Sequence, residues 1–300
     1  MNPLRAFLLG VLQGATEFLP VSSSGHLVLV PWLLNWPAPG LAFDAVVHWG
    51  TALAVVAYFW HDWVALVRAF FRSLRDLTWG SLRPAERGIQ SQERERASDR
   101  EVASQASQSS AEARLAWLIL LGTVPAALAG WLLEDFFEAM FGRPAAAAAF
   151  LLVTAALLTA SEWLGRRERD LDTLTWPDAL VVGIAQALAI FPGISRSGAT
   201  IAAGLSRGLR REPAARFSFL LATPIILGAG LLKVVDLAQV GGLAAQIPTL
   251  VVGFVTAAVI GLGCIHFLLR YLQRRRLYPF AVYCAVVGVA CLILALVRGG

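Results

Sequence analysis

The fold follows from the stretch Gln13-Gly-Ala-Thr-Glu-Phe-Leu-Pro-Val-Ser-Ser-Ser-Gly-His26, which interrupts the apolar segment 4–36 near its middle. A second apolar segment, 178–206, is interrupted in the same way by Pro192-Gly-Ile-Ser-Arg-Ser-Gly-Ala-Thr200. A broken apolar segment within a membrane is tolerated only where its backbone lines a cavity or is buried in protein. Each segment is therefore predicted to be a re-entrant helical hairpin.

The composition is that of a membrane protein. Hydrophobic residues make up 57% of the 300 residues and charged residues only 15%, against roughly 45–50% and about 25% in typical soluble domains. A soluble fold of this length has too little polar surface to cover so much apolar area. Soluble enzymes, secreted domains and nucleic-acid-binding proteins are thus excluded, and the net charge of +5 is attributed to cationic cytoplasmic loops rather than to a nucleic-acid partner.

The two interrupted segments resemble each other. A shift of 173 positions aligns five identical residues, and the aligned pairs are Gln13 with Gln186, Phe18 with Phe191, Ser22 with Ser195, Ser24 with Ser197 and Gly25 with Gly198. Paired interrupted segments in corresponding positions indicate an internal repeat with a binding site near the membrane midplane. We therefore predict a single membrane domain, 1–300, with a first half at 1–165 and a second half at 178–297.

Six apolar runs are long enough to cross a membrane, which takes about 17–25 residues. These predicted spans are 41–60, 115–133, 145–165, 217–235, 247–269 and 279–297. The polar stretch 82–113, rich in Ser, Gln, Glu and Arg, predicts a disordered or loosely helical linker. The predicted fold is an all-α polytopic membrane protein with six transmembrane helices and two re-entrant hairpins.

Loop charges predict the orientation. The loops 166–177, 207–216 and 270–276 hold 3, 4 and 4 Arg, whereas 134–144 and 236–246 hold only Arg143 between them. The positive-inside rule assigns the first three loops to the cytoplasm, together with 61–114. The first hairpin then enters from outside and the second from the cytoplasm, so the two halves are predicted to form an inverted repeat.

Polar side chains cluster in the two hairpins. Placing one polar or ionisable side chain within a membrane costs about 2.5–3.5 kcal/mol of insertion free energy. Gln13 and Glu17 are four residues apart and share a helical face. Ser- and Gly-rich loops before a helix expose backbone N–H groups to an anion, and the planar fork of Arg196 suits a phosphate. Glu17 and His26 supply an acid–base group and a candidate nucleophile. The pattern predicts phosphoryl chemistry on a lipid-borne substrate.

Other interpretations of these residues stay open. Glu17 could be only the structural partner of Arg196, and a Ser-rich turn is often only a helix cap. Asp44 and His48, which share a helical face in the first span, are interpreted as supporting or packing residues. His26, Ser23 and an activated water are all acceptable as the attacking group. The three cysteines are interpreted as small core residues.

The two motifs resemble the signatures of the undecaprenyl-pyrophosphate phosphatase family, in which Glu or Gln precedes Glu by four positions. Phe217-Ser-Phe-Leu-Leu-Ala-Thr-Pro224 also fits this family, and the resemblance covers nearly the whole chain. The insert at 82–113 departs from the shorter loop expected, but it lies away from the motifs.

The resemblance implies hydrolysis of a C55 polyprenyl diphosphate to the monophosphate, which recycles the lipid carrier for cell-wall synthesis and confers bacitracin resistance. It implies Glu17, His26, Arg196 and Ser23 as catalytic residues. It also implies a divalent cation, Mg²⁺ or Ca²⁺, largely bound by the diphosphate, for which Gln13 and Glu17 are the candidate ligands. The residues expected to bind the substrate are Gln13, Ser22, Ser24, Gly193, Ser195, Ser197, Gly198 and Thr200.

Two other classes of protein are alternatives to this enzyme. A transporter or flippase of a polyprenyl phosphate would also use inverted repeats, but it has less use for Glu17 and His26 together. A structural membrane subunit leaves the buried polar cluster unexplained. The expected location is the bacterial plasma membrane with the active site facing outward, and the small residues at 145–149 leave a homodimer open.

Overall fold

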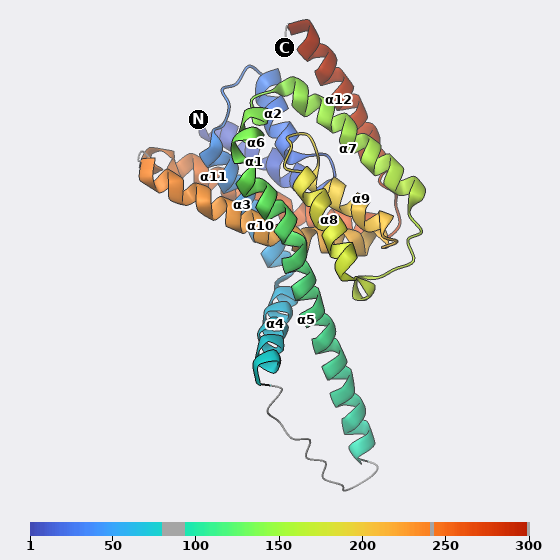
Figure 1. The fold of residues 1–300 in the computed structure, drawn as a ribbon. Helices are drawn as coiled ribbons and strands as arrows, with labels where there is room; N and C mark the ends of the chain where they lie inside the picture. Colours follow the sequence, from blue (N-terminus) through green and yellow to red (C-terminus); the bar gives the residue numbers. More distant parts are fainter. Residues whose placement is uncertain (80–93, 241–242, 299–300) are drawn as a thin grey trace.

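The computed structural model describes residues 1–79, 94–240 and 243–298 (Figure 1). These ranges are helical, apart from short connections and an isolated parallel β-bridge between Arg169 and Leu209. The helices are α1 Pro3–Phe18, α2 Ser23–Leu33, α3 Leu41–Tyr58, α4 Trp60–Trp79, α5 Arg94–Leu132, α6 Glu134–Phe141, α7 Pro144–Leu164, the short 3₁₀-helix η2 Leu171–Thr173, α8 Trp176–Leu188, α9 Arg196–Ser206, α10 Arg211–Val240, α11 Leu243–Leu272 and α12 Tyr278–Arg298.

Helices of transmembrane length lie where the sequence predicts them. Within the described ranges, five segments are long and apolar enough to cross a membrane: Gln108–Leu132, Pro144–Leu164, Arg211–Leu231, Gln246–Leu272 and Tyr278–Arg298. The predicted span 41–60 corresponds to α3, which is followed after a break at Phe59 by α4 at an angle of 81°, and this bent pair counts as a sixth candidate. An all-α polytopic membrane protein is thereby confirmed.

Several predicted loops are shorter than expected. Helix α10 already begins at Arg211, inside the predicted loop 207–216, and α6 occupies most of 134–144. Of the predicted linker 82–113, residues 82–93 lie outside the described residues, whereas 94–113 form the first part of α5 and are helical. Helix α4 and this part of α5 project below the body of the molecule (Figure 1).

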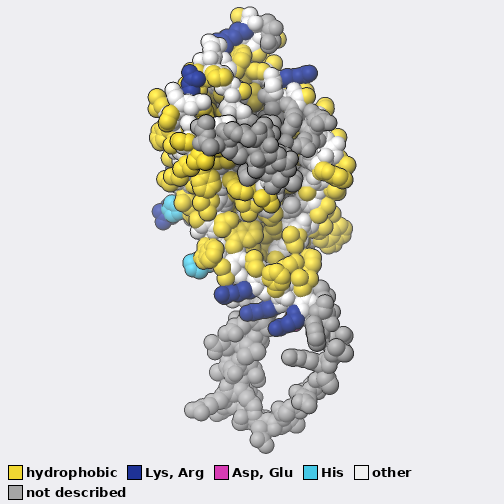
Figure 2. Space-filling model, turned by 90° about the vertical axis from the view of Figure 1, so that its left-hand side faces the viewer, with side chains coloured by type: hydrophobic (Ala, Val, Ile, Leu, Met, Phe, Trp, Pro, Cys, Tyr) yellow, Lys and Arg dark blue, Asp and Glu magenta, His cyan; other side chains and the backbone are white. Residues whose placement is uncertain are grey.

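The exterior carries an apolar band. Figure 2 shows hydrophobic side chains over the middle of one face, with Lys and Arg side chains mostly toward its two ends. Large apolar side chains on α12 are widely exposed, among them Val282, Val286 and Leu296 at 61%, 62% and 73%. A helix that exposes such residues is stable only against lipid or another protein, which agrees with a membrane-embedded body.

Each predicted hairpin is a pair of helices separated by a short break. Helices α1 and α2 are separated by residues 19–22, and α8 and α9 by residues 189–195. Helix α1 packs against α11 and α3, while α8 packs against α5 and α9 against α7 and α10. Glu17 therefore lies at the end of α1, whereas Ser23 and Arg196 are the first residues of α2 and α9.

Buried ion pairs hold the second hairpin in place. The carboxylate of Asp178, near the start of α8, accepts hydrogen bonds from Arg169 and from Arg207, both 2.7 Å long. Glu162 on α7 accepts two hydrogen bonds from Arg211 on α10, at 2.8 and 2.6 Å. Both carboxylate side chains are fully buried. Since removal of one partner from a buried pair costs about 3–5 kcal/mol, these contacts fix the ends of α7, α8, α9 and α10 relative to one another.

Candidate active site

The two hairpin loops contact each other directly. A Cβ added at Gly25 would lie 3.0 Å from the Cα of Gly193, and the Ser197 hydroxyl donates to the Leu19 carbonyl at 3.2 Å. Gly193 has a φ of +102°, and a Cβ there would overlap the carbonyl oxygen of Ala147. Glycine is therefore required at this point of the second loop, because only glycine combines this backbone conformation with so close an approach.

Serine residues cap both helices in the same way. The Ser22 hydroxyl accepts from the Gly25 N–H at 3.2 Å, and the Ser195 hydroxyl accepts from the Gly198 N–H at 3.0 Å. These are the pairs that the 173-residue shift aligns, so the local repeat extends to the capping hydrogen bonds, whereas the backbone differs, with a φ of +70° at Ser22 and −70° at Ser195. The first N–H groups of each helix have no intrahelical acceptor, and residues from both helix starts, Ser23 and Ser24 of α2 and Arg196 of α9, line one cavity.

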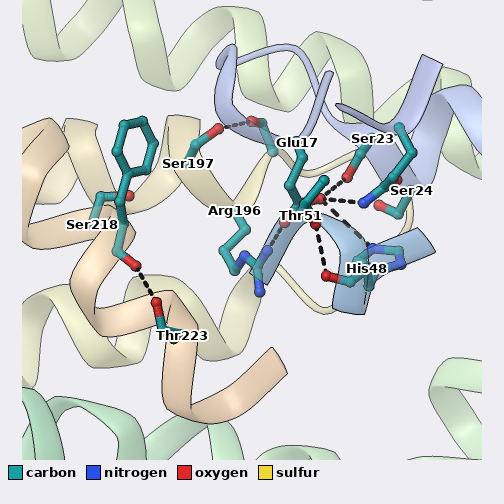
Figure 3. Close-up of polar contacts among 12 residues, drawn as sticks. Glu17, Ser23, Ser24, His48, Thr51, Arg196, Ser197, Ser218 and Thr223 are labelled. Carbon is teal, nitrogen blue, oxygen red and sulfur yellow. Dashed lines mark hydrogen bonds and ion pairs between the residues drawn. The ribbon is translucent and has the colours of Figure 1, made fainter. Parts of the chain in front are cut away.

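Glu17 is the centre of the polar cluster. Its Oε2 accepts from Gln13 Nε2 at 2.9 Å and from the Ser23 hydroxyl at 2.5 Å, and its Oε1 is ion-paired with Arg196 (Figure 3). The residue is 5% exposed. Arg196 of the second loop thus meets Glu17 of the first, and the predicted shared face of Gln13 and Glu17 is confirmed. A short hydrogen bond from a hydroxyl to a carboxylate is the arrangement expected of a base and the group that it deprotonates.

His48 also lies beside this carboxylate. Its Nε2 is 3.6 Å from Glu17 Oε2, and its Nδ1 is 2.7 Å from the backbone carbonyl of Asp44. Because a carbonyl oxygen can only accept, Nδ1 carries the proton of that bond, and Nε2 is the nitrogen that faces Glu17. His48 is interpreted from the sequence as a supporting or packing residue, and its position beside Glu17 agrees with support of the carboxylate rather than with packing alone. The sequence indicates a role for His48 only through its position in an apolar span, because a histidine buried in a membrane without a polar partner raises the free energy of the folded protein.

A cavity of about 140 Å³ opens at this cluster. Its polar lining consists of Glu17, Ser22, Ser23, Ser24, His48, Ser195 and Arg196. The remaining lining residues, among them Ile190 and Ile194, are apolar. A positive guanidinium, two helix starts and several hydroxyls around one small cavity favour a phosphate group.

His26 is positioned differently from the expectation. Its Nδ1 donates to the Ser22 carbonyl at 2.7 Å, and its Nε2 is 2.8 Å from the Tyr283 hydroxyl, which can donate to it. The ring stacks on Tyr283 and is 4% exposed. The ring is not among the residues that line the cavity. These contacts hold Ser22, whose φ is +70°, in a backbone conformation that is unfavourable for a serine.

Thr200, which the sequence predicts to bind substrate, and Thr154 form hydrogen bonds to the backbone of the second hairpin. The Thr200 hydroxyl bonds to the Arg196 carbonyl and lies 2.6 Å from the Ser218 hydroxyl. Thr154 on α7 donates to the Gly193 carbonyl and accepts from the Ser195 N–H, both at 2.9 Å. Three of the predicted substrate-binding residues line the cavity, namely Ser22, Ser24 and Ser195. The other five do not line it: Gln13, Gly193, Ser197, Gly198 and Thr200.

The cluster offers few ligands for a metal ion. Among the described residues, no group of three or more His, Cys, Asp or Glu side chains is placed to hold one. Glu17 is the only carboxylate in the cavity lining, and the Oε1 of Gln13 is buried without a partner. Mg²⁺ is often held by one or two protein oxygens together with substrate phosphates. The residues fit a cation of that kind, and they do not form a cage of their own.

Comparison with known proteins gives one family for nearly the whole chain. The family model described as bacitracin resistance protein BacA matches residues 6–290. An undecaprenyl-diphosphatase of Methanosphaera stadtmanae is 42% identical over 297 residues, which is 99% of each chain. Proteins of the same name from Thermomicrobium roseum and Geobacter metallireducens are 42% and 41% identical, over 98% of each chain. The chain therefore belongs to the bacitracin resistance protein BacA family.

Proposed function

We propose that this protein hydrolyses undecaprenyl diphosphate to undecaprenyl phosphate and inorganic phosphate, and so recycles the lipid carrier of cell-wall synthesis. The relatives named undecaprenyl-diphosphatase support this activity. The observation that carries the proposal is the carboxylate of Glu17, which accepts from Ser23 at 2.5 Å while it is paired with Arg196. One cluster thus joins an anion-binding group to a base and a hydroxyl.

The diphosphate is held by charge and by backbone dipoles. Arg196 turns from Glu17 toward the phosphates and binds them through its planar fork. The first N–H groups of α2 and α9 donate to the phosphate oxygens, and the dipoles of both helices favour the negative charge. A divalent cation that arrives with the diphosphate would contact Glu17 and Gln13 and would neutralise part of the phosphate charge.

Ser23 is the attacking group in this proposal. Glu17 takes the proton of the Ser23 hydroxyl, and Oγ attacks the terminal phosphorus of the diphosphate. The bond from that phosphorus to the bridging oxygen breaks, and undecaprenyl phosphate leaves. Water then attacks the phosphoserine and its two protons leave with the inorganic phosphate, while Ser23 recovers its own proton from Glu17. His26 is bonded through both ring nitrogens and supports the loop instead.

The membrane arrangement is proposed together with the function. The two helix pairs are re-entrant hairpins that enter from opposite sides, and the two halves, 1–165 and 178–297, form an inverted repeat. The matching caps at Ser22 and Ser195 support this repeat. The protein lies in the bacterial plasma membrane, and its cavity opens outward.

Phosphate release by the purified protein tests the function. Wild-type protein in detergent should release inorganic phosphate from undecaprenyl diphosphate and from farnesyl diphosphate, and Ser23→Ala should not. A radiolabelled terminal phosphate should be trapped on Ser23 in a rapid acid quench. Absence of phosphate release by the wild type would favour the transporter alternative, which needs the anion site but not the Ser23–Glu17 hydrogen bond. Label on His26 would overturn the assignment of Ser23.

A further inference from the structure

A second cavity adjoins the catalytic one and has a different chemical character. It has a volume of about 470 Å³, within the usual range for ligand pockets. Its walls come from α2, the connection 34–40, the start of α3 and the α6–α7 junction. Most of the lining is apolar, and its larger side chains are Leu27, Val28, Pro31, Trp32, Trp36 and Pro39.

The two cavities share part of their lining. Ser24 and His48 line both of them. Ser24, Leu27, Val28 and Pro31 are spaced as on one face of a helix, so one face of α2 extends from the catalytic serines into the apolar cavity. At a rise of 1.5 Å per residue, the path from Ser24 to Pro31 along this face is about 10 Å long.

The aromatic walls of this cavity are held in place by cations. The guanidinium of Arg298 lies 5.0 Å from the Trp32 ring centroid, and that of Arg5 lies 5.1 Å from the Trp36 ring centroid. Such contacts fix ring orientation in addition to the stabilisation they provide. The cavity is therefore formed before any ligand arrives, which lowers the entropic cost of binding.

We propose that this cavity binds the first isoprene units of the polyprenyl chain, with the diphosphate in the catalytic cavity beside it. The inference rests on the proposed function. It assigns a binding site to the prenyl chain, which the phosphate site does not hold. Apolar walls stabilise a hydrocarbon chain in proportion to the area removed from contact with water. An anionic group is disfavoured there, because the carboxylate oxygen Oδ1 of Asp44 is buried in this wall without a partner.

Two other apolar cavities lie elsewhere in the helical body. One lies between α7 and α12 and includes Ala156 and Val282, and another lies between α4, α5 and α10 and includes Phe70 and Pro224. Neither shares a lining residue with the catalytic cavity. A substrate whose phosphates bind at Arg196 cannot place its first carbons in either of them, since chain and headgroup are covalently joined.

Variants that fill the cavity test the proposal. Val28→Trp and Ala38→Trp each add bulk to the lining, and Ala38 is exposed in a connection, so this variant should fold. Both should raise the KM for farnesyl diphosphate by about tenfold or more. A single methylene group in an apolar pocket already changes the preference between two substrates by about this factor. Val30→Trp is the matched control, because Val30 is half-buried on the same helix and does not line the cavity.

The inhibition constant of inorganic pyrophosphate, which has no prenyl chain, should stay within about twofold in all three variants, because only the chain subsite is changed. Equal losses for farnesyl diphosphate and pyrophosphate, or an unchanged KM in both filled variants, would overturn the proposal. Failure of the proposed function is recognised separately, because the wild type would then release no phosphate from farnesyl diphosphate.

A photoreactive prenyl diphosphate provides a second measurement on the unaltered protein. With a diazirine in its first isoprene unit, it should label residues of α2 and of the connection 34–40, and excess farnesyl diphosphate should prevent the labelling. Labelling confined to α7 and α12 would place the chain in another cavity and refute the assignment.

Discussion

Replacement of Glu17 by Gln should abolish most of the activity while the fold is retained. The amide has nearly the same volume and can still accept the hydrogen bond of Ser23. It cannot take a proton from that hydroxyl, and it no longer neutralises Arg196. Glu17→Gln therefore separates the chemical role of the carboxylate from its packing role, which a change to Ala would not.

The expected loss can be estimated from these contacts. A positioned acid–base group contributes about 10²- to 10⁴-fold, which corresponds to about 2.7–5.4 kcal/mol of transition-state stabilisation at 1.36 kcal/mol for each factor of ten. We expect this loss in kcat, because the hydrogen bond from Ser23 to Glu17 Oε2 is already formed before substrate binds. The KM should change less than kcat, because Arg196 remains free to bind the phosphates.

Gln13→Ala is the control for this prediction. Gln13 donates one 2.9 Å hydrogen bond to the same carboxylate, but an amide cannot exchange a proton. Its loss should lower kcat by only about tenfold, in line with about 1.5 kcal/mol for a hydrogen bond to a charged group. The assay is phosphate release from farnesyl diphosphate by protein in detergent, with thermal unfolding measured in parallel. Equal losses of kcat in Glu17→Gln and Gln13→Ala, with unchanged thermal stability, would refute the role of Glu17 as the base. Glu17 would then only position the substrate or contact the metal ion.

Three further predictions concern the loops. Arg196→Lys should lower kcat/KM severely, by about 10²-fold or more, because a point ammonium cannot reproduce a bidentate fork; near-normal phosphate release would show that charge alone suffices. Gly193→Ala should yield little folded protein, since its φ of +102° and the neighbouring Ala147 carbonyl exclude a side chain, and a normal unfolding temperature would contradict this. Of the cysteines introduced singly at Ser22 and Ser24, in a background without the native cysteines, at least one should react with a membrane-impermeant thiol reagent in intact cells and be protected by substrate. Reaction only in inside-out vesicles would refute the outward opening.

Much of the site could be predicted because its determinants are local. Gln13 and Glu17 are one helical turn apart, so helix geometry alone places them on one face, and their 2.9 Å hydrogen bond follows. Ser22 and Ser195 precede glycines by three positions, which is the spacing at which a serine caps a helix. The apolar runs likewise fall within helices of transmembrane length, because hydropathy over such a length leaves few alternatives to a spanning helix.

The two histidines show where local reasoning ends. His26 is in the motif and three residues from Ser23, yet its ring turns to Ser22 and Tyr283, which is 257 residues away. His48, on another helix, occupies the place beside Glu17 that the sequence suggested for His26. Which of two nearby histidines faces a cavity depends on the rotation of α2 and α3 about their axes, and packing against other helices sets that rotation.

The sequence by itself determined the membrane-embedded helical architecture, the two interrupted segments and the identity of the central carboxylate, because composition, hydropathy and short-range spacing act within one helix or one turn. Only the tertiary structure decided the 81° bend after α3, the position of His48 at Glu17 and the apolar cavity beside the catalytic one. These features are formed by side chains from helices distant in sequence. Their positions follow from the close packing of whole helices, which no single segment encodes.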